Sequence, residues 1–244
     1  MTESLSRRAL VTGGSGEIGA AICRRLARAG HHVCVHAHRS TEAAESLVRE
    51  IVEAGGRAEP VCFDVTDASK VQAALKLLLV SGPIQILVNN AGVHDDAPFP
   101  GMTASQWHDV IDVSVNGFFN VTRALIMPMI RTRWGRIINT SSVSSLVGNR
   151  GQVNYAASKG ALNAATRALA LEVATRGITV NAVAPGIIAT AMSAQAFDAE
   201  AIARLVPMKR AGVPDEVAGL VAYLASEDAG YVTAQVIAIS GGLG

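Results

Sequence analysis

The sequence predicts an α/β fold built on a doubly wound sheet of about seven parallel strands, with helices on both faces. Three observations predict it. Short apolar runs alternate with longer helical stretches along the 244 residues, a glycine-rich turn follows the first run, and 50% of the residues are hydrophobic while only 4% are aromatic. An apolar content of Ala, Val, Ile and Leu is typical of buried parallel strands and packed helices.

Seven apolar runs have the length of a buried strand, and helical stretches separate them. The expected strands are Ala9–Thr12, Val33–Val35, Ala58–Phe63, Ile84–Val88, Arg136–Asn139, Ile178–Ala182 and Val236–Ile239. Glycine ends the first two helical stretches, at Gly30 and at Gly55-Gly56. The expected helices are Ile18–Ala29, Thr41–Ala54, Ala68–Val80, Ala104–Arg131, Val153–Thr175 and Asp215–Ala225. This order predicts right-handed crossovers between parallel strands.

The segment Ala184–Met192 is the longest one without a clear pattern, and a short helix is expected after it. Because ligands of α/β folds bind where the strands end, a mobile lid is expected here. No linker, repeat or low-complexity segment interrupts the chain. Residues 1–244 are therefore expected to form a single domain, with its substrate site at the carboxyl ends of the strands.

Composition excludes several classes of function. The formal net charge is +1 with no basic block or acidic tail, so binding to nucleic acid or to an anionic membrane is not indicated. Cys23, Cys34 and Cys62 form no CxxC pair, and their odd number favours reduced thiols in a cytoplasmic protein. Residues 1–8 contain no apolar signal core, and no stretch approaches the roughly 18 continuous apolar residues of a membrane span.

The glycine-rich turn joins the first expected strand to the first expected helix. Gly14, Gly16 and Gly19 match the pattern G-x-G-x-x-G. Glycine lets the backbone turn sharply and approach a pyrophosphate, which then sits at the positive end of the helix. Any tight βα turn favours glycine, but the position after the first strand favours a dinucleotide site of the Rossmann type. The residues expected to line it are Gly13, Ser15, Gly16, Ile18 and Gly19.

The end of the second strand indicates the kind of dinucleotide. Sites that prefer NAD often carry an acid there, which contacts the ribose 2′-hydroxyl. Here the chain reads His36-Ala37-His38-Arg39-Ser40, with no acid before Glu42. Arg39 and Ser40 suit a 2′-phosphate, since a guanidinium forms a fork that matches phosphate oxygens. NADPH is therefore the expected cofactor, the alternative being that Arg39 is a solvated residue at a strand end.

Four histidines near this region raise the question of a metal. They are His31, His32, His36 and His38. Two of them are adjacent, and no cysteine or carboxylate completes a recognisable ligand set. No metal site is expected.

Tyr155 and Lys159 lie four residues apart on an expected helix, which places both side chains on one face. A tyrosine hydroxyl is a poor proton donor or acceptor near neutrality, with a reference pKa of about 10. A neighbouring ammonium stabilises the phenolate and lowers that pKa, so such a tyrosine can exchange a proton with a substrate oxygen while hydride moves at carbon. Ser142, just after a strand, has a hydroxyl suited to holding that oxygen. A lone YxxxK is common on surface helices, but the glycine loop and Ser142 favour catalysis.

These marks, with three others, resemble the short-chain dehydrogenase/reductases over essentially the full chain. Asn89-Asn90-Ala91-Gly92 matches the family's NNAG, and the segment 185–190 matches its PGxxxT. Asp64 and Val65 match the pair that caps adenine in that family. The resemblance implies further cofactor contacts from Asp64, Val65, Asn90, Ala91, Gly92, Pro185, Gly186, Ile188 and Thr190, together with Tyr155 and Lys159.

Within the family, three segments are similar to the bacterial 3-oxoacyl-acyl-carrier-protein reductases: 148–155, 176–181 and 230–233. The runs 126–130 and 206–210 also resemble the reductases that serve aryl-polyene pigment synthesis. The resemblance implies NADPH-dependent reduction of a 3-oxoacyl thioester on acyl carrier protein. Tyr155 would protonate the oxygen, Ser142 would position it, and Lys159 would lower the Tyr155 pKa and hold the nicotinamide ribose. It also implies a homotetramer built from the two long helices and the C-terminal region.

Three departures from the family pattern stand out. Glu17 replaces the middle glycine of the family's TGxxxGxG loop, and Gly16 is expected to compensate. Ser114 replaces the family's fourth catalytic residue, an asparagine, and Asn116 lies roughly 200° further around the helix, too far to substitute. Met127 and Leu171 stand where some relatives carry carrier-docking arginines. Other candidates for docking are Arg123, Arg131, Arg150, Arg167, Lys209 and Arg210.

Two alternative functions stay open. A related enzyme acting on a free small ketone or alcohol fits the same motifs, because fold does not fix substrate. The second alternative is a nucleotide-binding regulatory protein with weak turnover, which the departures at Glu17 and Ser114 suggest. The presence of Ser142, Tyr155 and Lys159 argues against it.

Overall fold

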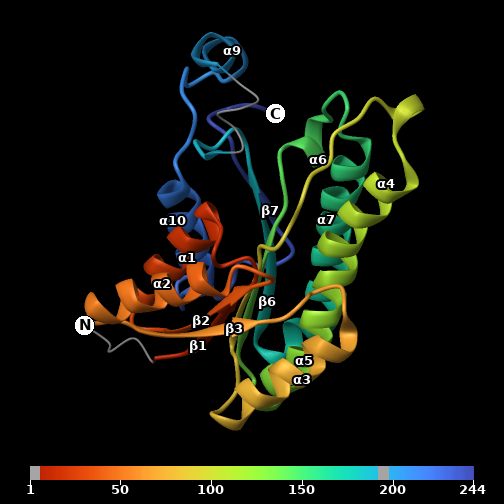
Figure 1. Ribbon diagram of the computed structural model, residues 1–244. Helices are drawn as coiled ribbons and strands as arrows, with labels where there is room; N and C mark the ends of the chain where they lie inside the picture. The colour runs from red at the N-terminus through yellow and green to blue at the C-terminus, as the bar shows by residue number, and fades with distance from the viewer. Residues whose placement is uncertain (1–5, 192–197) are drawn as a thin grey trace.

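A single sheet of seven parallel strands organises the computed structural model, which describes residues 6–191 and 198–244 (Figure 1). The strand order is β3-β2-β1-β4-β5-β6-β7. The strands are β1 Arg8–Val11, β2 His32–Ala37, β3 Arg57–Cys62, β4 Ile86–Asn89, β5 Gly135–Thr140, β6 Ile178–Pro185 and β7 Val236–Ile239. The order reverses between β1 and β4, and ligands of doubly wound sheets bind at such a switch point. The predicted fold class is confirmed.

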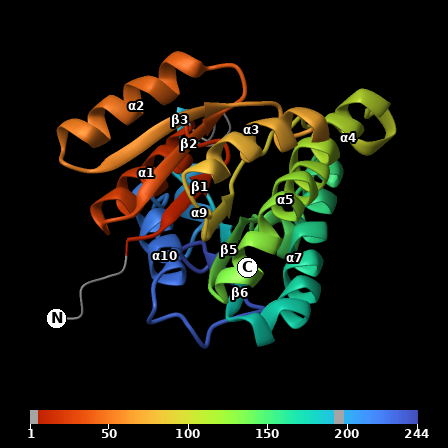
Figure 2. The ribbon, with the colours of Figure 1, turned by 90° about the horizontal axis from the view of Figure 1, so that it is seen from below.

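Helices cover both faces of this sheet, as the view from below shows (Figure 2). The α-helices are α1 Glu17–Arg28, α2 Thr41–Glu53, α3 Ala68–Val80, α4 Ala104–Ile111, α5 Gly117–Thr132, α6 Ser144–Val147, α7 Val153–Val173, α9 Ala199–Leu205 and α10 Pro214–Ala225. One apolar core joins the sheet to α1, α2 and α10, and a second joins it to α3, α5 and α7. The central strands β4, β5 and β6 are buried on both faces, whereas the edge strands β3 and β7 are partly exposed.

Element boundaries differ from the sequence-based expectations by a few residues. The largest difference is at β6, which continues through Ala184 to Pro185, so the patternless segment is shorter than expected. Gly186 and Ala189 after it donate backbone hydrogen bonds to Ile239 and Gly212. The mobile lid expected over Ala184–Met192 stays a prediction, and its last residue, Met192, lies outside the described residues. Residues 1–5 of the N-terminal segment lie outside them as well. The short helix expected after the segment corresponds to α9.

The prediction of one helix over Ala104–Arg131 is wrong in one respect. The helical run is divided by a π-helical turn, Asp112–Asn116, that joins α4 to α5. Gly117 begins α5 against Val65, and a Cβ at Gly117 would lie 2.9 Å from the Val65 Cγ2. Apolar periodicity within the helix cannot predict the contact between Gly117 and Val65, because Val65 belongs to a loop far away in sequence. Single π turns insert an extra residue into a helix and often occur at functional sites.

The continuous helical run Ala104–Thr132 is long and apolar enough to cross a membrane by length and composition, with a mean hydropathy of 1.2. It packs against α3 and α7 over the sheet. A helix of a globular fold that packs one apolar face on the core satisfies the same criterion, and this run buries Val121, Leu125 and Met129 in the second core.

Candidate active site

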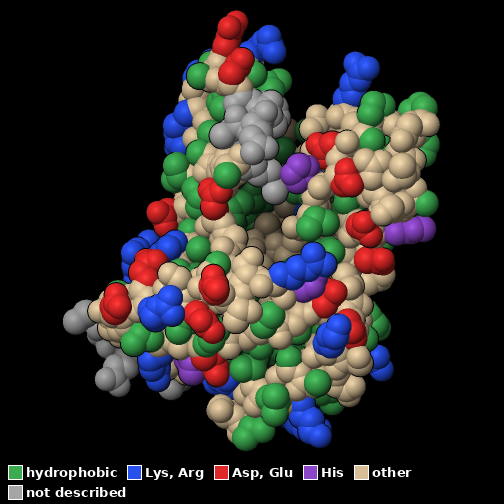
Figure 3. Space-filling view, viewed as in Figure 1, with side chains coloured by type: hydrophobic (Ala, Val, Ile, Leu, Met, Phe, Trp, Pro, Cys, Tyr) green, Lys and Arg blue, Asp and Glu red, His purple; other side chains and the backbone are tan. Residues whose placement is uncertain are grey.

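A cleft of about 420 Å³ opens beyond the carboxyl ends of β1, β4, β5 and β6. Figure 3 shows the surface hollowed between the arm that carries α9 and the arm formed by α6 and α7. Residues from both halves of the sequence line it. Among them are Ile18, Asn90, Gly92, Ser142, Tyr155, Lys159, Pro185, Gly186, Ile188 and Thr190. The structure therefore brings together residues from the glycine loop, NNAG, the Ser-Tyr-Lys set and PGxxxT.

The glycine-rich turn between β1 and α1, residues 12–16, is called the phosphate loop below. The backbone of this loop and of the start of α1 requires glycine at two positions. Gly13 has a φ of +62°, a left-handed conformation that favours glycine. A Cβ at Gly19 would lie 2.2 Å from the Gly13 carbonyl oxygen, so no side chain fits there. Gly16 has an extended backbone, and a Cβ there would meet no atom closer than 3.5 Å. The expectation that Gly16 compensates for Glu17 is therefore not supported, because Gly16 is an N-cap residue with room for a side chain.

Thr12 and Asn90 hold the phosphate loop against the end of β4. The Thr12 Oγ1 accepts hydrogen bonds from the backbone N–H groups of Asn90 at 2.9 Å and Ala91 at 3.0 Å. The Asn90 Nδ2 donates to the carbonyls of Thr12 and Gly13. Asn90 and Ala91 thus fix the loop on which a diphosphate would rest. The first N–H groups of α1, which no side chain caps, are open to an anion.

His36, considered above as a metal ligand, has a structural role in this site. Its Nδ1 accepts a hydrogen bond from the Gly13 N–H at 3.0 Å, and its Nε2 lies 2.9 Å from the Phe63 carbonyl. This pattern requires the neutral ring with the proton on Nε2. Burial lowers the His36 pKa to about 4. In the described parts of the chain, no three His, Cys, Asp or Glu side chains are grouped to hold a metal ion.

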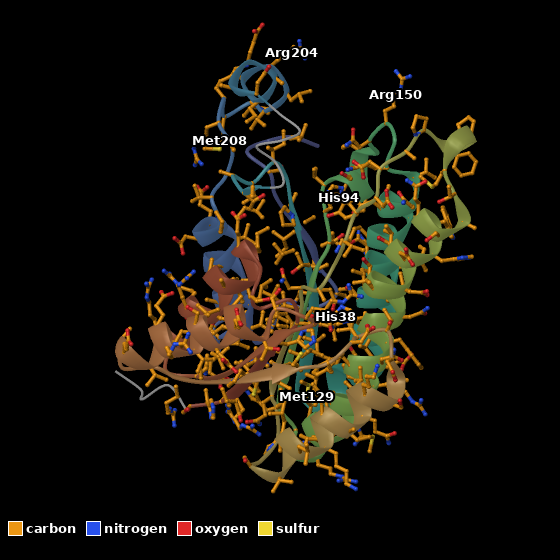
Figure 4. The ribbon with its side chains drawn as sticks, in the orientation of Figure 1. His38, His94, Met129, Arg150, Arg204 and Met208 are labelled. Carbon is orange, nitrogen blue, oxygen red and sulfur yellow. The ribbon has the colours of Figure 1, made fainter. Side chains whose placement is uncertain are left out.

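The residues expected at the ribose and adenine ends lie around the carboxyl ends of β2 and β3. Arg39 and Ser40 are exposed just before α2, so the guanidinium is accessible to a phosphate. Asp64 accepts hydrogen bonds from the Thr66 N–H at 2.9 Å and hydroxyl at 2.8 Å. His38, labelled in Figure 4 below the space between the two arms, lies 3.5 Å from the Asp64 carboxylate. Val65 is buried beside α5.

Ser142 and Tyr155 meet at the floor of the cleft. Burial raises the Tyr155 pKa, a hydrogen bond with the Ser142 side chain lowers it, and the Asp96 carboxylate raises it. The net direction is upward, so the phenol holds its proton near neutrality. The Ser142 Oγ also accepts the Ser144 N–H at 3.2 Å. A protonated phenol beside an oriented serine hydroxyl is suited to donate a proton to an oxygen bound between them.

Lys159 shares this floor but does not act on the phenol as expected. Its Nζ donates to the Thr140 carbonyl at 2.9 Å and lies 5.6 Å from the centre of the Tyr155 ring. Burial lowers the Lys159 pKa to about 8. The expectation that Lys159 lowers the Tyr155 pKa is therefore not met in this structure, because desolvation dominates the shift of both groups.

Ser114 stands behind Lys159 on the π turn and is 2% exposed. A Cβ at Gly92 would lie 3.1 Å from the Lys159 Nζ and 3.8 Å from the Ser114 Oγ, so both polar groups face the same side of Gly92. The Ser114 Oγ has no hydrogen-bond partner within the described ranges. Asn116 is exposed and donates to Asp112 at 2.6 Å, so it does not replace the expected asparagine.

The sequence interpretation missed the polar wall of the cleft. Gln152 Nε2 donates to Asp96 at 2.8 Å, and the Asp96 carboxylate lies 3.4 Å from the His94 Nδ1. Figure 4 shows His94 on the cleft side of the arm formed by α6 and α7. Buried Asn154 donates to the carbonyls of Asp95 and Gln106, both at 2.9 Å, and so anchors the start of α7 next to Tyr155. Gln152 and Asn154 lie in the segment 148–155 that carries the resemblance, and His94 and Asp96 lie two and four residues after NNAG, but no role was assigned to them from the sequence.

The motifs and their arrangement agree with comparisons to known proteins. Residues 7–201 match the family model described as short chain dehydrogenase. The chain belongs to the short-chain dehydrogenase family. A 3-oxoacyl-acyl-carrier-protein reductase from Aggregatibacter actinomycetemcomitans is 44% identical over 243 residues, covering 98% of this chain and 100% of the relative. Nodulation protein G from Azospirillum brasilense is 44% identical over 238 residues, covering 96% and 97%.

Solved structures of this short-chain dehydrogenase family superimpose closely. A putative gluconate dehydrogenase from Agrobacterium tumefaciens has a TM-score of 0.94 at 33% identity, covering 100% of this chain and 98% of that one. A gluconate 5-dehydrogenase from Burkholderia cenocepacia J2315, in complex with NADP and tartrate, has a TM-score of 0.93 at 35% identity, covering 98% and 96%. The chain is thus an oxidoreductase whose relatives act on different carbonyl and alcohol substrates.

Proposed function

We propose that this oxidoreductase uses NADPH to reduce a 3-oxoacyl thioester, carried on acyl carrier protein, to the 3-hydroxyacyl thioester. The observation that carries the proposal is the Ser142–Tyr155 pair at the floor of a cleft that also holds the phosphate loop. The sequence identity of 44% with a 3-oxoacyl-acyl-carrier-protein reductase supports the choice of substrate.

The residues of the cleft would have different roles in binding the substrate oxygen, donating the proton and holding the cofactor. NADPH supplies the hydride when bound. Ser142 orients the substrate oxygen, and the Tyr155 phenol, which burial keeps protonated, donates the proton. Lys159, whose Nζ donates to the Thr140 carbonyl on the same floor, would hold the nicotinamide ribose. Pro185, Gly186, Ile188 and Thr190 would border the nicotinamide.

The choice of NADPH rests on the end of β2. Exposed Arg39 is suited to pair with a 2′-phosphate, and no acid stands there to receive a 2′-hydroxyl. Gly13, Ser15, Ile18 and Gly19 would hold the diphosphate. The NADP complex of the gluconate 5-dehydrogenase supports the same cofactor for this chain.

The carrier protein is acidic, so docking should use basic side chains near the cleft mouth. Arg150 and Arg204 stand at the outer ends of the two arms that flank the cleft (Figure 4). Arg210 is already engaged by two hydrogen bonds with Glu216, at 2.9 and 2.7 Å. Lys209 donates to the Ala203 carbonyl. Of the cations around the mouth, Arg150 and Arg204 are therefore the best candidates for docking.

Rates of NADPH oxidation with three substrates test this proposal. The same 3-oxoacyl chain is presented on acyl carrier protein and on a small thiol, beside a free ketone of similar size. We expect the carrier-bound chain to have the highest kcat/KM at low salt and its advantage to shrink as salt screens the charges. The charge reversals Arg150→Glu and Arg204→Glu should reduce that advantage without changing the rate on the small thiol, whereas Arg49→Glu on α2 should leave both unchanged.

A short-chain dehydrogenase for a free small molecule is the second candidate. The structures of the two gluconate dehydrogenases favour it, as does the polar wall of His94, Asp96 and Gln152. If the carrier gives no advantage and the free ketone is reduced much faster than either thioester, this candidate replaces the first.

We further propose that the chain forms one functional domain and acts as a cytoplasmic homotetramer. Exposed apolar side chains on the two long helices support an assembly: Phe119 and Met127 on α5 are 55% and 50% exposed, and Leu171 on α7 is 79% exposed. Sedimentation of the purified chain measures its oligomeric state.

A further inference from the structure

Glu17 is a carboxylate at the first position of α1, where a dinucleotide would place its diphosphate. We propose that Glu17 is a positioning residue that ties the phosphate loop to the segment after β6 and thereby slows the exchange of cofactor. The inference rests on the proposed function only in requiring that a dinucleotide binds in this cleft.

The tie is a single hydrogen bond between distant parts of the chain. The Ala191 N–H donates to the Glu17 Oε1 at 2.8 Å, across 174 residues of sequence. Both residues are exposed, so the contact lies at the edge of the cleft. Their neighbours Ile18 and Thr190 both line the cavity. The hydrogen bond therefore joins the two walls between which the cofactor must enter and leave.

Among the described residues, the backbone N–H groups of Gly186, Ala189 and Ala191 anchor the segment after β6, and Glu17 accepts the hydrogen bond from Ala191. Gly186 donates to the Ile239 carbonyl at 2.9 Å, and Ala189 donates to the Gly212 carbonyl at 2.8 Å. These two contacts hold the segment to β7 and to the stretch before α10. The third contact, from the Ala191 N–H to Glu17, reaches the first residue of α1, directly after the phosphate loop. A glycine at position 17 would offer no side-chain acceptor for it.

The same carboxylate has a second, opposite effect. It is favoured by the positive end of α1, but it repels a diphosphate that approaches the same helix end. The negative charge of Glu17 should slow the association of the dinucleotide, and salt should weaken this effect. The hydrogen bond between Glu17 and Ala191 should slow the dissociation of the bound dinucleotide. The two effects are separable, because glutamine keeps an oxygen acceptor without the charge and alanine removes both.

Stopped-flow fluorescence of NADPH with Glu17→Gln and Glu17→Ala tests the proposal, and Glu45→Ala on the exposed face of α2 is the control for net charge. We expect both Glu17 variants to associate faster than the native chain at low salt. Dissociation should accelerate about five- to tenfold in Glu17→Ala, the size expected for the net contribution of one hydrogen bond, and by less than twofold in Glu17→Gln. The Glu45→Ala variant should match the native chain in both rates.

Hydrogen exchange of the Ala191 amide in the cofactor-free protein measures directly whether the hydrogen bond from Ala191 to Glu17 is formed. Exchange should be faster in Glu17→Ala than in the native chain and in Glu17→Gln. Equal Ala191 exchange in all three proteins, or equal dissociation rates with normal NADPH binding, would overturn the assignment of Glu17. A native chain that binds neither NADPH nor NADH would instead refute the proposed function, and with it any effect of Glu17 on cofactor exchange.

Discussion

His36 should make the stability of this protein fall as the pH drops below neutrality. Its ring accepts the Gly13 N–H and donates to the Phe63 carbonyl, an arrangement that only the neutral ring can make. Burial lowers its pKa from 6.5 to about 4 in the folded chain. The unfolded chain therefore binds this proton more readily than the folded chain does. The stabilisation is complete above pH 6.5 and is lost as the pH falls towards 4.

The magnitude follows from the size of the pKa shift. One pKa unit corresponds to about 1.4 kcal/mol, so this site should reduce the free energy of unfolding by about 2 kcal/mol at pH 5 and about 3 kcal/mol at pH 4. Other groups titrate in the same range, so the difference between two proteins is the useful quantity. Asparagine at position 36 offers an oxygen for the Gly13 N–H but does not titrate, so His36→Asn should lack this part of the pH dependence.

Urea unfolding between pH 7.5 and 4, at one protein concentration, measures the difference. His36→Asn should be less stable than the native chain at pH 7.5, because it loses the ring packed 4.1 Å from the Phe63 ring. The gap between the two proteins should then narrow by about 2 kcal/mol on going to pH 5. The control His108→Asn, on the exposed side of α4, should keep the native pH dependence. Parallel curves for the native chain and His36→Asn would refute the reasoning.

Three further predictions test the cofactor and catalytic sites. Arg39→Ala should weaken NADPH binding about tenfold or more and leave NADH binding unchanged, as titrated by fluorescence, and equal use of both cofactors by the native chain would contradict the assignment. Gly19→Ala should abolish tight dinucleotide binding because its Cβ would lie 2.2 Å from a backbone oxygen, whereas Gly16→Ala should bind normally because its Cβ has room; the reverse order of affinities would show that the loop is misassigned. Ser114→Asn should stay active and turn over at least as fast, and a native chain with no turnover on any carbonyl that Ser114→Asn rescues would show that serine had silenced the enzyme.

The sequence predicted the features that depend on local pattern. The alternation of strands and helices follows from apolar periodicity, and the pattern Gly14, Gly16 and Gly19 located the glycine loop. The structure shows that Gly13 and Gly19 are the glycines its backbone requires. The placement of Tyr155 and Lys159 on one helical face follows from their spacing of four residues. These features need no knowledge of which segments meet in space.

The features that the sequence did not predict arise from tertiary contacts. The π turn before α5 goes with the packing of Gly117 on Val65, and the pKa of Lys159 falls to about 8 because the fold buries it completely. The contact between Glu17 and Ala191 joins residues 174 positions apart. No short window of sequence contains such information.

The central claim is that the Tyr155 phenol donates the proton during carbonyl reduction, and the Tyr155→Phe variant tests it most directly. This change removes the hydroxyl and keeps the half-buried ring, so the fold and the cofactor site should be preserved. With NADPH and the best carbonyl substrate, kcat should fall by at least about 10²-fold, the lower end of what general acid catalysis supplies, while the Kd for NADPH stays within twofold. Tyr223→Phe, on α10, should behave as the native chain. A Tyr155→Phe variant that binds NADPH and retains most of the native turnover would contradict the account.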